Sequence, residues 1–374
     1  MQGRRPSPYL LRQTALLAAS LVFGGTQALA ATDLSKVCPS PFVIQMDWYP
    51  QAEHGPEYQL LGDDYKIDAK NKKVRGSLIS QGKPTGIEVE VRSGGPAIGN
   101  MPVPSVMYTD DSVHVGMVST DIAISLYSAT PVKAIMAVWE KSPILFMWDP
   151  ASYPDVHTIA DLGKNNIIVN ISPWAKYASW LIASGLMRKD LIDKSYDGSP
   201  TQFIAADGKY AQQGTATNEP YLYEHEFKAW KKPVRFQLLH DAGYKPYFAA
   251  ASVKPSAIES LAPCLKQLVP IWQQAIVDYL ASPDRANKII VDTVSQFRDF
   301  WTYSEQRAKV AHEAILKLNL MSNGSDKTIG DMNPERIQEL IANMRLGGEK
   351  IPDDLTAEKL LTNQFIDPAI GLPQ

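Results

Sequence analysis

Short apolar segments alternate with helix-like segments along the chain, and this alternation limits the fold more than any other feature. Phe42–Met46 is a short apolar run, and Gly86–Arg92 alternates apolar and polar residues with a period of two, so both predict β-strands. Val113–Val118 predicts another strand, and Ser119–Asp121 behind it is a typical helix start. Strands that alternate with helices favour a mainly parallel sheet with helices on both faces. The sequence therefore predicts an α/β fold.

The pattern restarts after Trp148, which predicts a second α/β lobe inserted into the first. We expect the first lobe over residues 41–148 and 245–374, and the second lobe over residues 149–244. The chain after Ser256 has helical periodicity and is expected to form a cover. Two lobes joined by two crossings create a cleft at the carboxyl ends of both sheets, where open α/β sheets bind ligands.

Other local predictions concern single elements. Residues 57–68 are expected to form a helix and residues 202–205 a short strand. Ile144–Trp148 is expected as the last strand of the first lobe. Pro102-Val103-Pro104 is expected to take the place of a regular helix.

The N-terminal residues have the pattern of a signal peptide. A basic start without acidic residues precedes the apolar stretch Ala15–Phe23, and Ala28-Leu29-Ala30 is a small-x-small cleavage signal. The apolar stretch is shorter than the roughly 20 residues that span a bilayer. We expect a signal peptide over residues 1–30, cleavage near Ala30, a periplasmic location and no direct membrane insertion. No Cys stands at the cleavage point to carry a lipid.

Charge and cysteine content exclude two classes of function. The chain has 37 Lys and Arg against 40 Asp and Glu, and removing the three leader arginines leaves 37 − 3 = 34, a net charge near −6. That balance does not favour nucleic-acid binding. Two Cys are too few for a Cys-rich zinc module. Cys38 and Cys264 either form a disulfide in an oxidising compartment or are small buried side chains.

The segment Asp47–Gly55, just after the first predicted strand, contains an acid, an indole and an imidazole. Trp48 is suited to stack on an aromatic ring, while Asp47 and His54 are suited to hydrogen-bond its polar edge. The alternative is structural: Trp48 packs in the core between the lobes and Asp47 caps a turn.

Asp47-Trp48-x-Pro50 followed by His54-Gly55 resembles the opening of the thiamine-precursor-binding proteins. That group lies within the superfamily of nitrate, sulfonate and taurine periplasmic binding proteins. Thr217-Asn218-Glu219-Pro220 is similar to the Asn-Glu-Pro loop of the family's second lobe. The resemblance covers roughly residues 42–365 and implies the two-lobed type II fold of periplasmic binding proteins, with a ligand cleft between the lobes and a helical C-terminal cover.

The resemblance also implies ligand-binding roles for particular residues. Trp48 would be the stacking platform and His54 a polar contact, while Asn218 and Glu219 would close from the second lobe onto ring nitrogens or an exocyclic amine. The alternative for Asn218 and Glu219 is a plain turn. Ser119 and Asp121 either contact the ligand or cap a helix. Gly94-Gly95, after a strand, either forms a turn or lets backbone N–H groups approach an anion.

The sequence has no phosphate-binding glycine loop, no nucleophile elbow and no clustered histidines, and the iron-binding cysteine motif of the related fungal enzyme is missing. We therefore expect no catalytic residue, no metal and no cofactor. The expected function is the monomeric solute-binding component of an ABC importer, whose partners are the transmembrane permease and its ATPase. A thiamine-precursor pyrimidine is the first expected solute, and a nitrate, sulfonate or taurine is the second. The alternatives are an exported enzyme that uses His54 as acid or base, and a sensor domain that presents its ligand to a receptor.

Overall fold

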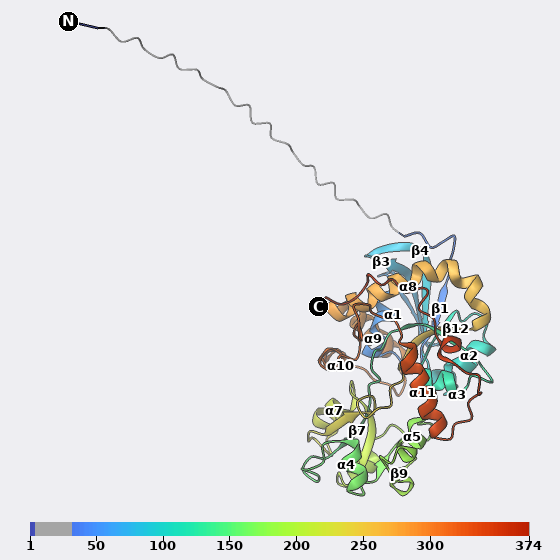
Figure 1. The fold of residues 1–374 in the computed structure, drawn as a ribbon, viewed down its shortest axis with the longest axis vertical. Coiled ribbons are helices and arrows are strands. Elements are labelled where there is room, and N and C mark those ends of the chain that lie inside the picture. The colour runs from blue at the N-terminus through green and yellow to red at the C-terminus, as the bar shows by residue number, and fades with distance from the viewer. Residues whose placement is uncertain (4–31, 374) are drawn as a thin grey trace. The chain divides into compact units, whose positions relative to one another are not determined.

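The computed structural model describes residues 1–3 and 32–373, and the predicted signal peptide with its cleavage point at Ala30 falls almost entirely outside them. Within residues 32–373 the strands form one seven-stranded and one five-stranded sheet (Figure 1). Of the helices in the described part of the chain, none has the length and apolar character needed to cross a membrane. The predicted α/β class is confirmed.

The first sheet has the strand order β2-β3-β4-β1-β5-β12-β6. β1 pairs in parallel with β4 and β5, whereas β12 pairs antiparallel with β5 and β6. β2 and β3 extend one edge of the sheet as antiparallel strands. The strands are β1 (Phe42–Gln45), β2 (Lys66–Asp68), β3 (Lys73–Ser80), β4 (Lys83–Arg92), β5 (Val115–Val118), β6 (Lys133–Ala137) and β12 (Ala250–Val253).

The second sheet has the strand order β11-β7-β10-β8-β9. β8 pairs in parallel with β9 and β10, and β7 pairs antiparallel with β10 and β11. The strands are β7 (Ile144–Trp148), β8 (Val169–Asn170), β9 (Ile192–Asp193), β10 (Ala211–Thr215) and β11 (Arg235–Leu238).

The strand Ile144–Trp148 differs from the prediction, since we expected it in the first lobe and it is β7 of the second sheet. Leu145 to Trp148 are fully buried, as expected for a strand covered on both faces. Such an apolar run fits either sheet, so the sequence alone does not show which sheet the strand joins. The crossing into the second lobe therefore precedes this strand.

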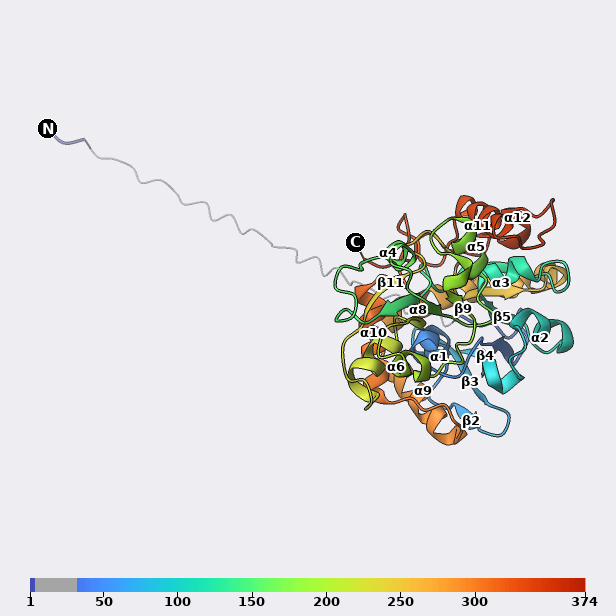
Figure 2. The ribbon, with the colours of Figure 1, turned by 90° about the horizontal axis from the view of Figure 1, so that it is seen from below.

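Helices cover the first sheet on both sides. Seen from below, α2 and α3 lie on one side of β4 and β5, while α1 and α9 lie on the other (Figure 2). The helices are α1 (Gly55–Gln59), α2 (Val103–Thr109), α3 (Thr120–Ser125), α4 (Ile159–Lys164), α5 (Tyr177–Ala183), α6 (Thr201–Ala205), α7 (Glu219–Tyr221), α8 (Ile258–Ala281), α9 (Asp284–Phe297), α10 (Glu305–Lys317), α11 (Pro334–Leu346) and α12 (Ala357–Leu360). The chain after residue 256 is mainly helical, as its periodicity predicts.

Two hydrophobic clusters form the core, and each draws residues from both sheets. Alternate residues of one strand enter different clusters: Leu145 and Met147 of β7 join one, and Phe146 and Trp148 join the other. Successive side chains of a strand point to opposite faces of its sheet, so each cluster covers one face. Apolar packing is thus continuous between the lobes on both faces.

Three local predictions were wrong. Residues 57–68 are not one helix, because α1 ends at Gln59 and Lys66–Asp68 is β2. The Gly62 N–H donates to the Ser77 carbonyl at 2.7 Å, which ties this stretch to β3. Residues 202–205 belong to helix α6 because Phe203 turns inward against other aromatic rings. Pro102-Val103-Pro104 begins α2, since a proline in the first turn of a helix loses no hydrogen bond.

Candidate functional site

The segment between β1 and α1 is held in place by aromatic side chains from the C-terminal helical region. The Trp301 indole donates to the Pro50 carbonyl at 3.1 Å, and the Ala52 N–H donates to the Tyr303 hydroxyl at 3.0 Å. The Tyr279 hydroxyl donates to the Ala52 carbonyl at 2.8 Å. This segment carries Asp47, Trp48 and His54 at the carboxyl end of β1.

Trp48 is half-buried and stands edge-on to Trp301, with ring centroids 6.2 Å apart. A Cβ atom on Gly95 would lie 2.4 Å from the Trp48 ring, so only a glycine at this position allows the indole to pack directly against the backbone of residue 95. The Gly94 N–H donates to the Trp48 carbonyl at 2.9 Å and is therefore not available to an anion. Gly95 therefore supports the indole, whereas Gly94 lies against the backbone of Met46 and Asp47.

His54 and Asp47 form a hydrogen-bonded pair, with 3.0 Å between His54 Nε2 and Asp47 Oδ1. His54 lies on the short 3-10 helix η1 (Ala52–His54) and is buried. Burial opposes a charged imidazole, but the hydrogen bond and charge of Asp47, with the charges of Glu57 and Glu53, outweigh it and raise the pKa of His54. Nδ1 of His54 is buried without a hydrogen-bond partner.

Glu53, beside His54, was not among the predicted site residues. It is buried on η1, and its Oε1 accepts hydrogen bonds from the Thr217 hydroxyl and, at 3.1 Å, from Asn218 Nδ2 of the second lobe. Burial raises the pKa of the Glu53 carboxyl, and the charge of Glu219 raises it further. Its second oxygen, Oε2, is buried without a partner. The carboxyl ends of β1 and β10 therefore face each other at this contact.

Glu219 is a second carboxylate of the site, and it is half-buried on the second lobe. Its Oε2 accepts from the Thr215 N–H at 2.6 Å and from the Thr215 hydroxyl at 2.9 Å. The Tyr196 hydroxyl lies 3.4 Å from Oε1. Burial raises the pKa of Glu219 as well. Each lobe thus contributes one carboxylate whose charged form is opposed by its surroundings.

Ser119 and Asp121 form a separate group at the start of α3. Asp121 accepts from the Ser119 hydroxyl at 2.6 Å, from the Ile122 N–H at 2.9 Å and from the Tyr244 hydroxyl at 3.1 Å. Among the described residues, no hydrogen bond joins these two side chains to the other predicted site residues. The Ser119 hydroxyl bonds to Asp121 and caps no backbone N–H of α3, so the cap alternative does not hold for Ser119.

Arg307 of α10 is a further buried group that the sequence analysis missed. It donates to the Thr302 carbonyl at 2.6 Å and to Asn218 Oδ1 at 3.3 Å, and its guanidinium lies over the Tyr303 ring at 5.1 Å. No ion pair of the described residues includes Arg307. Glu53 lies inside the Asp47–Gly55 motif and could have been recognised from the sequence. No local pattern connects Arg307 to Asn218, which is 89 positions away in the sequence.

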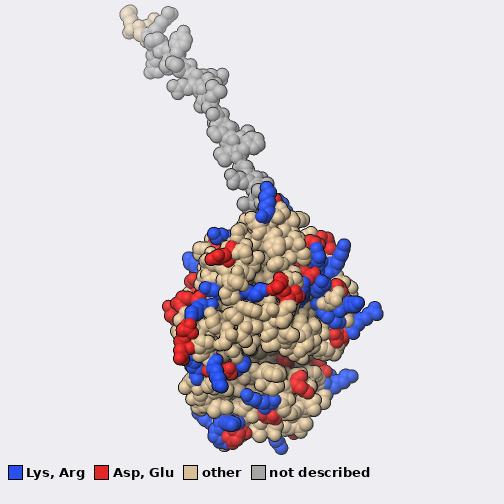
Figure 3. Space-filling view, turned by 90° about the vertical axis from the view of Figure 1, so that its right-hand side faces the viewer, with Lys and Arg blue, Asp and Glu red and all other residues tan. Residues whose placement is uncertain are grey.

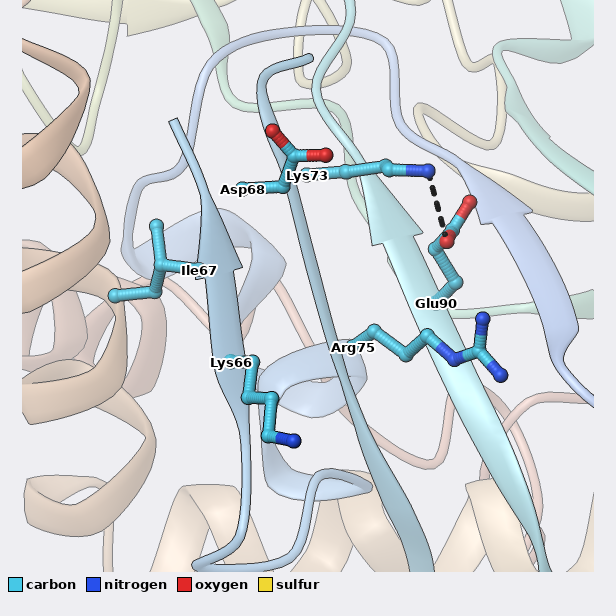
Figure 4. A pocket seen from close by; sticks show the side chains of 6 residues that line it. All are labelled: Lys66, Ile67, Asp68, Lys73, Arg75 and Glu90. Carbon is cyan, nitrogen blue, oxygen red and sulfur yellow. Dashed lines mark ion pairs between the residues drawn. The ribbon is translucent and has the colours of Figure 1, made fainter. Parts of the chain in front are cut away.

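The surface is hollowed between the upper and lower parts of the molecule in Figure 3, with acidic atoms at the hollow. A separate pocket of about 250 Å³ lies at the β2–β4 edge, lined by charged side chains that include Lys66, Lys73 and Glu90 (Figure 4). Lys73 is paired there with Glu90 at 3.1 Å. Within residues 1–3 and 32–373, no group of three or more His, Cys, Asp or Glu is placed to hold a metal ion.

Neither a protein-family model nor a curated protein matches the chain. Solved structures do. The periplasmic aliphatic sulphonate binding protein SsuA from Escherichia coli has 11% identity over 90% of this chain and 95% of its own, with a TM-score of 0.52. A ligand-binding component of an ABC-type import system from Staphylococcus aureus has 12% identity over 86% of this chain and 97% of its own, with a TM-score of 0.52.

A third solved structure names the shared architecture. A Candida albicans gene product described as having the generic periplasmic binding protein fold has 10% identity over 88% of this chain and 98% of its own, with a TM-score of 0.50. The chain therefore has the periplasmic binding protein fold, and the resemblance found in the sequence is confirmed at the level of the fold.

Proposed function

We propose that this chain is the exported solute-binding component of an ABC importer, and that it captures a small heteroaromatic solute with N–H donors between its two lobes. The first expected solute is a thiamine-precursor aminopyrimidine, which the chain would deliver to a membrane permease. The shared fold supports the general role, because proteins of this fold include the ligand-binding component of an import system.

The observation that carries the choice of solute is the pair of carboxylates Glu53 and Glu219, one on each lobe. Glu53 is buried and Glu219 is half-buried, the charge of Glu219 raises the pKa of Glu53, and Glu53 Oε2 has no partner. A solute that places N–H groups between them supplies charge-assisted hydrogen bonds and relieves the repulsion. A sulfonate or nitrate would add a third negative group. Trp48, exposed on part of its ring beside Trp301, supplies a face for stacking an aromatic ring.

The test is isothermal titration calorimetry of the protein with the aminopyrimidine, taurine, an alkanesulfonate and nitrate. We expect binding of the aminopyrimidine with a stoichiometry of one. Glu219→Gln should weaken it about tenfold or more, since a hydrogen bond to a charged group is worth about 1.5–3 kcal/mol. Trp48→Ala should weaken it up to about tenfold, since aromatic stacking is worth about 0.5–1.5 kcal/mol. Glu224→Gln is the matched control, because Glu224 is exposed a few residues further along. Equal affinities in Glu219→Gln and Glu224→Gln would contradict the assignment.

Arg307 favours a second candidate, an alkanesulfonate. It is a buried guanidinium without an ion-pair partner in the described part of the chain, and the E. coli protein of this fold is named for sulphonate binding. In the same titrations, binding of the sulfonate without the pyrimidine selects this candidate. Loss of that binding in Arg307→Met would then identify the anion contact.

The rival classes are separated by further measurements. Recovery of the solute unchanged after incubation supports a carrier, whereas turnover through His54 indicates an enzyme. Stimulation of a permease-associated ATPase by the loaded protein distinguishes an importer component from a sensor domain. Export and cleavage predict that the secreted protein begins at Ala31, which N-terminal sequencing checks.

A further inference from the structure

Two crossings connect the lobes, and they lie next to each other. The first crossing is residues 138–143, between β6 and β7, and the second is residues 239–249, between β11 and β12. Backbone hydrogen bonds join the chain at both ends of the crossings, from Val138 to Ala249 at 3.2 Å and from Leu239 to Ile144 at 2.9 Å. Any rotation of one lobe against the other must bend both segments.

Arg336, in the first turn of α11, bonds to both crossings at once. In the first crossing, Nη1 donates to Glu140 Oε1 at 2.8 Å and Nη2 donates to the Glu140 carbonyl at 2.7 Å. In the second crossing, Nε donates to the Lys245 carbonyl at 2.9 Å and Nη2 donates to the Pro246 carbonyl at 3.0 Å. The guanidinium lies 3.8 Å from the centre of the Tyr247 ring, and the side chain is 11% exposed. Because a guanidinium presents its donors in one rigid plane, these bonds fix the spacing of the two crossings.

The middle of each crossing has little else to hold it. Among the hydrogen bonds of the described residues, the carbonyls of Glu140, Lys245 and Pro246 accept only from Arg336. Backbone carbonyls that lie away from water need a donor. Loss of the guanidinium would therefore remove the constraint on both segments at the same time.

Helix α11 extends this contact to both lobes. It packs against α3 of the first lobe and α5 of the second (Figure 1). Its start is fixed on the second crossing, because the Asn333 N–H donates to the Tyr247 hydroxyl at 2.8 Å. Its buried residues belong to a hydrophobic cluster that draws on both sheets: Ile337, Leu340, Ile341 and Met344. Arg336 therefore stands where the two crossings and a helix shared by the lobes meet.

We propose that Arg336 is the positioning residue of the hinge: it keeps the two crossings together, so that the lobes close on a solute along one path and meet in one orientation. Closure still depends on the solute, since Glu53 Oε2 and Arg307 Nε are buried without partners when no solute is present. Without Arg336 each crossing would bend separately, and the loops that carry Trp48 and Glu219 would meet in more than one orientation. The inference deepens the proposed function and rests on it, because it assumes that a solute is captured between the lobes.

The test is electron–electron double resonance between spin labels on the two lobes, without solute and with saturating aminopyrimidine. Gln296→Cys on α9 and Lys164→Cys on α4 provide exposed label sites, and the two native cysteines are joined to each other. In the parent protein we expect the aminopyrimidine to shift the distances into one narrow peak. In Arg336→Met the distance distribution should be wider in both states. The affinity for the aminopyrimidine should fall about tenfold, as follows if about one closure in ten reaches the aligned orientation.

Arg345→Met is the matched control, since Arg345 lies on the same helix but donates to the Pro352 and Asp353 carbonyls, outside the crossings. Glu140→Ala is a milder second variant, which removes one of the contacts and keeps the test valid if Arg336→Met does not fold. A purely structural role would lower the melting temperature without widening the distance distribution. The inference is wrong in that case, and also if Arg345→Met widens the distribution equally. If the parent protein binds no aminopyrimidine, the proposed solute is wrong, and the widths measured without solute still test the hinge.

Discussion

Gly95 and Gly99 stand at the two ends of the same short turn, and only one of them touches the candidate site. Both have a positive φ, +57° and +63°, so alanine at either position carries the backbone cost of the left-handed region, about 1 kcal/mol. A Cβ on Gly95 would meet the Trp48 ring at 2.4 Å, whereas a Cβ on Gly99 has no atom within 4 Å. Comparing alanine substitutions at the two glycines therefore distinguishes the cost of backbone strain, which both share, from the cost of displacing the Trp48 indole, which only Gly95→Ala carries.

We predict that Gly95→Ala loses more stability than Gly99→Ala, by about 1 to 3 kcal/mol, because the alanine forces Trp48 to move in a packed region. Urea unfolding measures the difference, and tryptophan fluorescence should change only in Gly95→Ala. The same titrations as above should show weaker solute binding in that variant. Equal stability and equal spectra in the two variants would show that Trp48 does not depend on Gly95.

Glu57 gives the fold a pH dependence. Its side chain is 1% exposed, the Trp272 indole donates to Oε1 at 3.2 Å, and Oε2 has no partner. Burial raises the pKa of Glu57 to about 8. Between its ordinary pKa and pH 8 the folded protein keeps a proton that the unfolded chain releases, so rising pH favours unfolding.

We predict that the free energy of unfolding falls on the order of 3 kcal/mol between pH 5 and pH 8, since each pKa unit is worth about 1.4 kcal/mol. Glu57→Gln should flatten this slope without abolishing it, because the raised pKa of His54 acts in the same direction. Urea titrations at several pH values measure the slope. Glu259→Gln, an exposed acid on α8, should keep the parent slope; a parent protein that gains stability toward pH 8 would refute the assignment.

At the scale of elements, local signals predicted well where a segment contains its own signal. The apolar run of β1 and the period-two pattern of β4 mark those strands. The secondary-structure prediction failed where the conformation of a segment depends on residues that are distant in the sequence. Residues 66–68 become a strand because β3 offers them an edge, and Phe203 becomes helical because it packs on Tyr223 and Trp230.

The same distinction applies to the candidate site. Its two loops were recognisable because each carries a short motif, Asp47–Gly55 and Thr217–Pro220. The contact between the two loops could not be recognised from the sequence, because it arises only where the carboxyl ends of β1 and β10 meet in the fold. Arg307 enters from a helix whose sequence shows only helical periodicity.

The disulfide between Cys38 and Cys264 joins the segment before β1 to helix α8, so the pairing alternative holds. The two residues are 226 positions apart, and closing a loop of that length removes about 5 kcal/mol of unfolded-state entropy in the chain-entropy model. We predict that Cys38→Ala with Cys264→Ala loses about 3 to 5 kcal/mol of stability in urea unfolding. A loss below about 1 kcal/mol would mean that other contacts dock this segment on α8.

At the scale of the whole molecule, the two sheets repeat one arrangement. The five strands β4-β1-β5-β12-β6 and the five strands β9-β8-β10-β7-β11 each place one antiparallel strand fourth in the order. In both sheets that strand is the first one after the chain crosses from the other lobe. Each of these strands follows a crossing, but only the first lobe is discontinuous, because the second sheet uses the consecutive strands β7 to β11, which are inserted between β6 and β12 of the first sheet.

This interleaving, with core clusters that each draw on both sheets, predicts that the lobes unfold together. We expect one transition in differential scanning calorimetry, with a calorimetric enthalpy equal to the van't Hoff enthalpy. Fluorescence and far-UV circular dichroism should give the same midpoint. Arg307→Met should lower that midpoint without splitting the transition, because the apolar contacts between the lobes remain after the Arg307–Asn218 hydrogen bond is lost. Two separated transitions in the parent protein would show that the polar and apolar contacts between the lobes are too weak to couple their folding.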